Sequence, residues 1–370
     1  MQIQNAPHHH LLLAIIPLFI ASVGLAATPP AQPRSGPGGT SYSHKKVLKN
    51  VYGSGVDQYW IYEPAKPAPA SAPVIVFNHG WGAVNPRSYG GWIDHLVRRG
   101  NIVIYPRYQD QWRYPPDKIA SNAVRAVSNA IYRLQDGTHV KPDVNKIAFL
   151  GHSAGGQTAA NMAVLARKVG IPAPKAVMCV QPGKSWTKSE KMRIPLEALS
   201  NMPANVLLLT VVGDKDMIAR DTDAKRIFYE TTQIPLTNKS YITLVSDDHG
   251  KPILLANHFA PCALNSDYNS GEKPEGPYDK LPFLSRLREK FRSRFGGQSG
   301  NTDFPSLTEN LRPADALDYY GLWKLFDGLC TAAFYGKDRQ HTMGNTPQQR
   351  YMGKWSDGVG VKRLLVTDKP

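Results

Sequence analysis

The chain has 370 residues, of which 42% are hydrophobic, and it carries a formal net charge of +15 and three cysteines. This length is enough for one large α/β domain or two small ones, and we expect one because the chain has no internal repeat. The positive charge does not indicate nucleic-acid binding, because no recognised binding module accompanies it. No cysteine or histidine spacing indicates a zinc or iron–sulfur site.

The N-terminal region predicts export. Residues 11–25 form a short apolar run that Pro17 interrupts and small residues follow, so residues 1–27 are predicted to be a secretory signal peptide. The alternative is an uncleaved N-terminal anchor. Residues 28–43 are rich in Pro, Gly and Ser and predict a flexible leader. We expect residues 44–370 to form a single domain that is secreted or periplasmic, and monomeric.

Short apolar segments alternate with amphipathic segments along most of the chain. The apolar segments predict strands at 73–77, 101–105, 146–150, 176–180, 206–212 and 241–245. The amphipathic segments predict helices at 89–99, 117–134 and 156–168. Continuous apolar strands that alternate with helices predict a mostly parallel sheet covered on both faces. In such sheets, ligands gather at the carboxyl ends of the strands.

The strongest functional signal is the sequence Gly151-His-Ser-Ala-Gly155, between the predicted strand 146–150 and the helix that follows it. A G-x-S-x-G motif in this context predicts a nucleophile elbow, with Ser153 as the nucleophile. Small neighbours let the strand and helix approach each other, and the helix N-terminus favours developing negative charge. We expect His152 to be an elbow residue that points away from the catalytic side chains.

A serine nucleophile needs a base and an acid that orients the base. Asp214 and Asp216 follow the predicted strand 206–212, and the turn geometry favours Asp216 as the acid. His249 lies in the exit loop of the next strand and is the predicted base. His258 is the alternative base, although its apolar neighbours favour a structural role.

Acyl transfer also needs donors for an oxyanion and a pocket for the substrate. We expect the backbone N–H groups of Ala154 and Trp81 to be the donors, with Trp81 in the Gly-containing turn after the strand 73–77. Aromatic side chains near the predicted strand ends, among them Tyr89 and Trp186, are the predicted lining of the pocket.

Together these motifs resemble the serine α/β-hydrolases, in the branch that holds dienelactone hydrolase-like esterases, chlorophyllase-like proteins and secreted polyester hydrolases. The residues that carry the resemblance are His79–Gly82, Gly151–Gly156, Gly213–Asp216 and Asp248–His249, and they follow the expected chain order. Two features depart from the pattern. Dienelactone hydrolases proper use a cysteine nucleophile where this chain has serine, and most relatives end soon after the histidine.

The resemblance implies an α/β-hydrolase fold with a C-terminal extension or lid. It also implies a secreted carboxylic-ester hydrolase that forms an acyl-enzyme on Ser153, acts on a small-molecule or polymeric ester, and needs no cofactor or metal. A serine peptidase or amidase on the same scaffold is the first alternative. A non-catalytic binding protein with this fold is the second.

The C-terminal extension contains a predicted basic amphipathic helix at 280–295. This helix could pack on the domain surface, act as a lid or rim, or contact an anionic membrane surface. Residues 257–305 are the candidate lid or rim. An apolar helix at 314–334 is expected to cover one face of the sheet, and residues 351–366 could add an edge strand.

The three cysteines have different predicted roles. Cys179 lies in an apolar predicted strand and is expected to be a buried thiol. Cys262 and Cys330 could form a disulfide in an exported protein.

Overall fold

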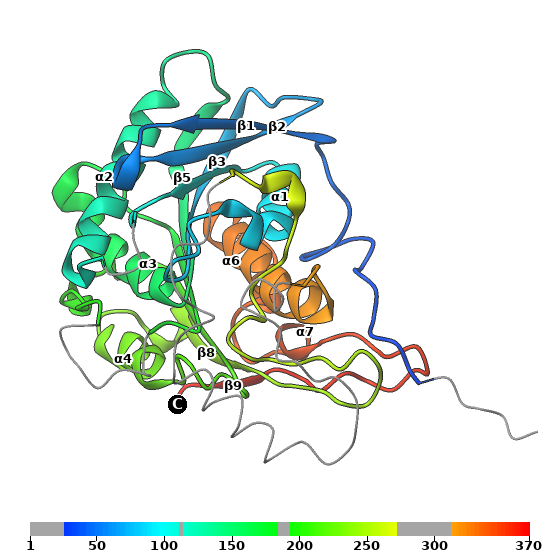
Figure 1. Cartoon of the computed structure of the whole chain (residues 1–370). Helices are drawn as coiled ribbons and strands as arrows, with labels where there is room; N and C mark the ends of the chain where they lie inside the picture. Colours follow the sequence, from blue (N-terminus) through cyan, green and yellow to red (C-terminus); the bar gives the residue numbers. More distant parts are fainter. Residues whose placement is uncertain (1–25, 111–113, 184–192, 272–311) are drawn as a thin grey trace, which may run out of the picture.

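A computed structural model describes residues 26–110, 114–183, 193–271 and 312–370. In this part of the chain, nine strands form one sheet in the order β1-β2-β4-β3-β5-β6-β7-β8-β9 (Figure 1). The strands are β1 Lys46–Tyr52, β2 Tyr59–Ala65, β3 Ser71–Asn78, β4 Ile102–Pro106, β5 Lys141–His152, β6 Ala176–Val180, β7 Leu207–Gly213, β8 Lys239–Leu244 and β9 Leu365–Thr367. The helices are α1 Gly90–Arg98, α2 Ile119–Arg133, α3 Ala154–Leu165, α4 Thr222–Glu230, α6 Lys324–Tyr335 and α7 Pro347–Arg350, with a π-helical turn Leu317–Trp323 before α6.

The central strands are parallel and the outer strands are antiparallel. β4, β3, β5, β6, β7 and β8 pair in parallel, whereas β1, β2 and β9 pair antiparallel at the two edges. Leu150 of β5 aligns with Phe77 of β3 and with Met178 of β6, so the apolar positions of neighbouring strands lie side by side. This arrangement confirms the predicted mostly parallel sheet of the α/β-hydrolase fold.

Helices cover both faces of the sheet. α1 and α6 pack on one face, where Trp92 and Phe326 belong to the same core cluster. α2 and α3 pack on the other face (Figure 1). All residues from Ala154 to Val164 of α3 are buried, because this helix packs on β3, β5 and β6 and also contacts α2. The Gly and Ala residues of α3 allow that close packing.

Several elements differ from the sequence-based prediction. The edge strands β1 and β2 and the helix α4 were not predicted from the pattern. β1 has only exposed and half-buried residues, because it lies at the edge of the sheet, so it lacks a continuous apolar signal. Of residues 351–366, only the last two contribute to a strand, β9. The apolar segment 314–334 does cover one sheet face, as predicted, through the π-helical turn and α6.

The leader predicted to be flexible is instead tied to the domain over its described residues. Thr28, the first residue of the leader, accepts a hydrogen bond from the backbone N–H of Ser356 at 3.0 Å, and Ala27 just before it accepts one from the backbone N–H of Lys251 at 2.8 Å. Further along, Tyr320 donates its hydroxyl to the carbonyl of Ala31 at 3.1 Å. Backbone groups in Pro/Gly-rich segments need partners as others do, and here the folded domain supplies them.

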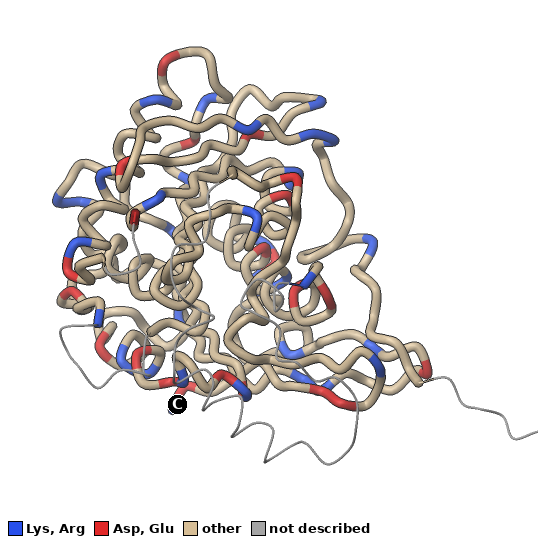
Figure 2. Tube along the Cα trace, in the orientation of Figure 1, with Lys and Arg blue, Asp and Glu red and all other residues tan. Residues whose placement is uncertain are grey.

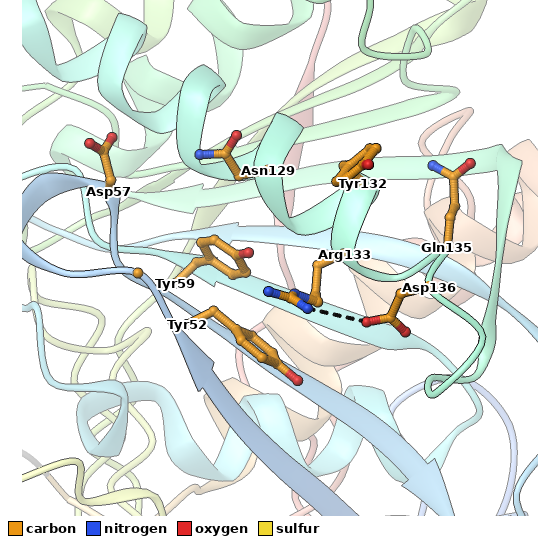
Figure 3. Close-up of a pocket in the computed structure, with 9 residues that line it drawn as sticks. Tyr52, Asp57, Tyr59, Asn129, Tyr132, Arg133, Gln135 and Asp136 are labelled. Atoms are coloured by element: carbon orange, nitrogen blue, oxygen red, sulfur yellow. Dashed lines mark hydrogen bonds and ion pairs between the residues drawn. The ribbon is translucent and has the colours of Figure 1, made fainter.

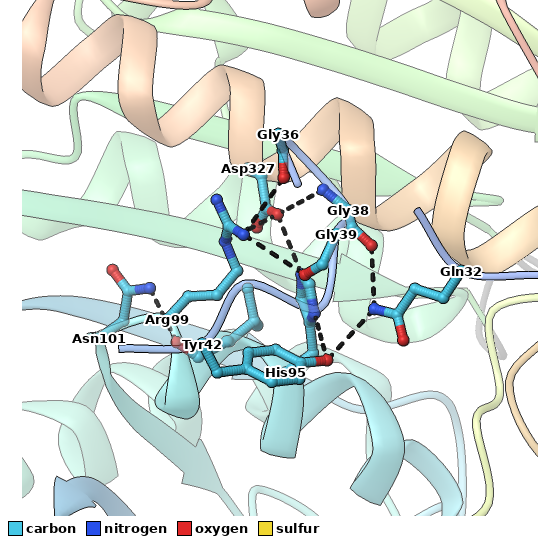
Figure 4. A network of polar contacts seen from close by, with 10 residues as sticks. Gln32, Gly36, Gly38, Gly39, Tyr42, His95, Arg99, Asn101 and Asp327 are labelled. Carbon is cyan, nitrogen blue, oxygen red and sulfur yellow. Dashed lines mark hydrogen bonds and ion pairs between the residues drawn. The ribbon is translucent and has the colours of Figure 1, made fainter. Parts of the chain in front are cut away.

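Asp327 of α6 is the main anchor of the leader (Figure 4). Its side chain is 4% exposed, and its Oδ2 lies 2.7 Å from the backbone N of Gly38, 2.9 Å from Nε2 of His95 and 3.1 Å from Nε of Arg99. Burial raises the pKa of Asp327, but His95, Arg99 and the Gly38 N–H together outweigh it and hold that pKa below its ordinary value. One buried carboxylate therefore joins the leader, α1 and α6.

Asp327→Asn is expected to lower the free energy of unfolding by about 3 kcal/mol at neutral pH, because buried donors lose their charged acceptor. The lowered pKa means that the carboxylate stabilises the fold above its unfolded pKa of about 3.9 and loses this effect as the pH falls through the folded value. The difference between the two proteins in urea unfolding should therefore shrink in acid. Glu230→Gln, which breaks the exposed pair with Arg226, is the control and should cost below about 1 kcal/mol. Equal stability of Asp327→Asn and wild type would contradict the anchoring role.

Three predictions fall largely outside the described residues. They are the signal peptide at 1–27, of which the structure describes only Ala26 and Ala27, the basic helix at 280–295, and the lid or rim at 257–305 beyond residue 271. Within the described ranges, no helix is long and apolar enough to cross a membrane. Figure 2 shows Lys and Arg interspersed with Asp and Glu around the periphery of the described chain.

Candidate active site

The nucleophile elbow connects β5 to α3. Ser153 stands between His152, the last residue of β5, and Ala154, the first of α3, with φ 56° and ψ −123°. A positive φ at a non-glycine residue is strained, and the surrounding structure must hold it. The Ser153 N–H donates to Val180 at the end of β6 at 2.9 Å, and the Gly156 N–H donates to the Ser153 carbonyl at 2.9 Å.

Two glycines of the motif are required by close backbone approaches. A Cβ atom on Gly151 would lie 1.9 Å from the carbonyl oxygen of Gly155. A Cβ atom on Gly155 would lie 2.1 Å from the carbonyl oxygen of Asn78, at the end of β3. No side chain fits at either distance, so the tight turn that presents Ser153 depends on glycine at both positions.

The structure brings Ser153, His258 and Asp216 into one hydrogen-bonded chain. Nε2 of His258 lies 3.0 Å from Oγ of Ser153, and Nδ1 of His258 lies 2.9 Å from Oδ2 of Asp216. All three residues are buried, with exposed fractions of 7% for Ser153, 6% for His258 and 5% for Asp216. The order of residue types along the chain is the expected Ser, Asp, His, but the histidine is not the predicted one.

His249 is therefore corrected to His258 as the histidine of this site. His249 lies in the loop closed by the bridge between Asp247 and Leu254. Its Nε2 contacts Oδ2 of Asp357 at 2.7 Å, and the two side chains are 36% and 43% exposed. The Asp247 carboxylate holds this loop against the C-terminal segment by accepting the Lys362 backbone N–H at 2.8 Å. The loop therefore turns away from Ser153.

The chain returns to the sheet edge only after this loop. The Lys215 N–H donates to the carbonyl of Ala256 at 3.2 Å, and the Gln181 side chain donates to the carbonyl of Asn257 at 2.7 Å. These bonds join the segment before His258 to residues that follow β6 and β7. They place the His258 side chain over Ser153. The sequence contained His258, but its apolar neighbours reflect the burial of the site and not a structural role.

Of the two carboxylates after β7, Asp216 is the one that contacts the histidine. Its Oδ1 accepts the backbone N–H groups of Ile218 at 2.8 Å and Ala219 at 2.9 Å, which leaves Oδ2 for His258. Burial raises the pKa of Asp216, but the charge and hydrogen bond of His258 and the two backbone N–H groups together lower it. Asp214 instead braces the turn by accepting the hydroxyl and N–H of Ser246.

The turn that contains Trp81 lies against the elbow. A Cβ atom on Gly80 would lie 3.5 Å from Cβ of Ser153, so the backbone approaches the nucleophile closely. The turn is fixed by a bond from the Ala83 N–H to the Gly80 carbonyl at 3.0 Å and by one from the Gly82 N–H to Oε1 of Gln109 at 2.8 Å. Ala154 begins α3 directly after Ser153, so its N–H is one of the free donors at the helix N-terminus.

The predicted pocket residues have other positions. Tyr89 is 1% exposed and belongs to the core, so its assignment as pocket lining was wrong. Its hydroxyl instead lies 3.0 Å from the backbone N of Gly80 and 2.8 Å from Nδ1 of His152. Trp186 lies outside the described residues.

Two buried histidines beside Ser153 are held neutral. Burial, followed by the charge of His258, lowers the pKa of His152 to about 3, and burial lowers the pKa of His79 to about 4. The His79 ring stacks on Tyr108 at 4.1 Å between ring centroids. The His152 ring lies 4.8 Å from the His258 ring, so His152 does not point away from the site as expected.

The cysteines and possible metal ligands form no further centre in the described residues. Cys179, Cys262 and Cys330 are buried free thiols, so the structure does not contain the disulfide considered between Cys262 and Cys330. Burial raises the pKa of Cys262 to about 12. Over the described ranges, no cluster of His, Cys, Asp and Glu is suited to a metal ion.

A separate pocket of about 510 Å³ lies between α2 and the ends of β1 and β2 (Figure 3). Figure 3 shows the Tyr52 and Tyr59 rings beside the Arg133 guanidinium, which interacts with Asp136 at 3.4 Å. None of Ser153, Asp216 and His258 lines this pocket, so it is distinct from the hydrogen-bonded site.

Comparison with known proteins connects the site to one family. Residues 52–213 match the family described as Chlorophyllase. No curated protein matches the chain. The matched segment contains the Trp81 turn and Ser153, and it ends before Asp216 and His258, so the assignment of those two residues rests on the geometry above.

Proposed function

We propose, on the premise that this chain is a hydrolase of the α/β type related to the Chlorophyllase family over residues 52–213, that it is a serine carboxylic-ester hydrolase. The single observation that carries the proposal is the bonded chain from Ser153 Oγ through His258 to Asp216. A serine with this base and orienting acid, on a strained elbow, has the arrangement that nucleophilic acyl transfer needs.

The proposed reaction proceeds in two halves. Nε2 of His258 takes the proton of Ser153 as Oγ attacks the ester carbonyl carbon, and the oxyanion that forms accepts the N–H groups of Ala154 and Trp81. His258 then gives its proton to the leaving alcohol, and an acyl-enzyme remains on Ser153. Water, deprotonated by His258, attacks the acyl-enzyme and releases the carboxylic acid together with free Ser153.

Ester and amide hydrolysis use the same residues, so the leaving group must be tested directly. We expect the protein to hydrolyse short-chain p-nitrophenyl esters faster than the corresponding p-nitroanilides, and to react covalently with a fluorophosphonate probe. Ser153→Ala is the negative control and should not be labelled, whereas Ser121→Ala, at an exposed serine of α2, should be labelled normally. Faster anilide hydrolysis would favour the peptidase or amidase alternative. A folded protein that neither hydrolyses nor reacts would favour the non-catalytic binding protein.

We also propose that the protein is exported, since residues 1–27 have the composition of a signal peptide. N-terminal sequencing of protein recovered outside the cytoplasm tests this proposal. A chain that keeps Met1 there would support the uncleaved anchor instead. Contact of the basic segment 280–295 with anionic lipid remains a proposal that vesicle binding tests.

A further inference from the structure

We infer that Tyr89 is a positioning residue of the active site, whose hydroxyl holds the Gly80–Trp81 turn and the His152 ring in fixed positions beside Ser153 and His258. This inference rests on the proposed ester hydrolase and goes beyond it, because the hydrogen bonds from Tyr89 to Gly80 and His152 would act on the reacting groups through their neighbours.

Two functional segments meet at the Tyr89 hydroxyl. The Gly80 N–H donates to Tyr89 Oη at 3.0 Å, and Oη lies 2.8 Å from Nδ1 of His152. A Cβ atom on Gly80 would lie 3.1 Å from that hydroxyl and 3.4 Å from Nδ1 of His152. The site thus has one oxygen atom between the turn proposed to stabilise the oxyanion and the strand end that presents Ser153.

The position of the hydroxyl is set by the core. Tyr89 precedes α1, and its ring lies 5.0 Å from Phe77 and 6.3 Å from Tyr105 between ring centroids. Only 1% of the residue is exposed. Side chains in close-packed cores keep a single rotamer, so the ring acts as a rigid support for its hydroxyl.

Burial decides the charge of the His152 ring, and the hydrogen bond to Tyr89 fixes its position. A tyrosine oxygen can accept two hydrogen bonds and donate one, so Tyr89 accepts the Gly80 N–H and is also hydrogen-bonded to Nδ1 of His152. Burial, followed by the charge of His258, lowers the pKa of His152 to about 3, so the ring that Tyr89 holds is neutral.

A neutral His152 matters because of its neighbour. The His152 and His258 rings lie 4.8 Å apart, and His258 becomes a cation during each half of the proposed reaction. A second cation at this distance in a buried site would oppose that protonation. Burial keeps His152 neutral, and the hydrogen bond to Tyr89 holds this neutral ring in place beside His258.

The Tyr89 hydroxyl also restricts the backbone of the Gly80–Trp81 turn. Gly80 immediately precedes Trp81, whose N–H is the proposed second oxyanion donor, and the Gly80 carbonyl accepts the Ala83 N–H at 3.0 Å. With the N–H of Gly80 held by Tyr89 and its carbonyl held by Ala83, the peptide group that carries the Trp81 N–H has little freedom to rotate. Donors that are oriented before the reaction stabilise an oxyanion best.

Tyr89→Phe removes this hydroxyl and keeps the ring. We expect kcat for a p-nitrophenyl ester to fall about tenfold to hundredfold, because the donor is misaligned and not lost. KM should change less than about twofold, since the contacts matter most in the transition state. The affinity for an alkylboronic acid, which forms a tetrahedral adduct with the serine, should fall by the same factor as kcat. If Tyr89 had only a structural role, Tyr89→Phe would lower the fraction of folded, active protein, and the affinity of that fraction for the boronic acid would stay unchanged.

Tyr268→Phe is the matched control. Tyr268 is 3% exposed in the same core cluster and donates its hydroxyl to Asp94 at 3.0 Å, away from the turn and the elbow. This variant should lose comparable stability and keep kcat and boronic acid affinity. Equal kcat values for Tyr89→Phe and an active wild-type protein would overturn the inference about Tyr89 and leave the proposed function intact. An inactive wild-type protein would contradict the proposed function itself.

Nitrogen-15 NMR of labelled histidine tests the hydrogen bond between Tyr89 and His152 without any activity. We expect His152 to remain neutral between about pH 5 and 8, where an ordinary histidine titrates, and its Nδ1 shift to change in Tyr89→Phe but not in Tyr268→Phe. An unchanged Nδ1 shift in Tyr89→Phe would overturn the inference.

Discussion

His258→Ala is expected to lower kcat for ester hydrolysis about 10⁶-fold, which is the size of effect that follows removal of the general base from a serine triad. Ser153 then has no acceptor for its proton, since Nε2 of His258 is the base within hydrogen-bond distance of Oγ, at 3.0 Å. The residual rate should come from the oxyanion donors and substrate binding. Steady-state kinetics on the purified variant, with circular dichroism to check the fold, measures this effect.

His249→Ala is the control for that experiment and should change kcat less than about twofold. Its ring contacts the exposed carboxylate of Asp357, and exposed pairs of this kind contribute below about 1 kcal/mol to stability. The two alanine variants each remove a histidine side chain from the segment that follows β8. Comparing their kcat values therefore shows which histidine is the base. An inactive His249→Ala with an active His258→Ala would show that the base was assigned incorrectly.

Asp216→Asn is expected to lower kcat about 10⁴-fold, as removal of the orienting carboxylate does in other serine triads. The amide has the same shape, but its NH₂ group cannot accept the Nδ1–H of His258, so the ring would adopt the wrong tautomer or orientation. The fold should tolerate the change, because the amide oxygen can still accept the N–H groups of Ile218 and Ala219.

Asp214→Asn is the matched variant on the same turn. Asp214 binds Ser246 at 2.6 Å and does not contact His258, so kcat should stay within about tenfold of wild type. Because the pKa of Asp216 is lowered, its carboxylate stays ionised at every pH above its ordinary range, and any loss of activity near neutral pH must come from another group. A larger effect at Asp214 than at Asp216 would contradict the assignment of the acid.

The features that could be predicted correctly are those whose signal is local in the sequence. The apolar runs of β3, β5, β6 and β7 and the helical periodicity of α2 are set by neighbouring residues, because a strand buried on both faces is apolar throughout and a helix that packs on a sheet is apolar on one side. The elbow is also local. At Gly151 and Gly155 a Cβ atom would clash with backbone atoms, so the tight turn requires glycine at both positions. The motif in the sequence therefore predicts the turn directly.

Which side chains meet in the site depends on contacts between distant parts of the chain. His249 and His258 follow the same strand, and only the bonds from Lys215 and Gln181 to the segment before His258 bring the second of them over Ser153. The leader was misjudged for a related reason. Its Pro/Gly composition predicts flexibility, but the partners of its backbone, such as Asp327, lie far along the chain. Residues that are distant in sequence produce no periodic pattern, and they come into contact only when the sheet has formed. Their contacts therefore could not be predicted from the sequence.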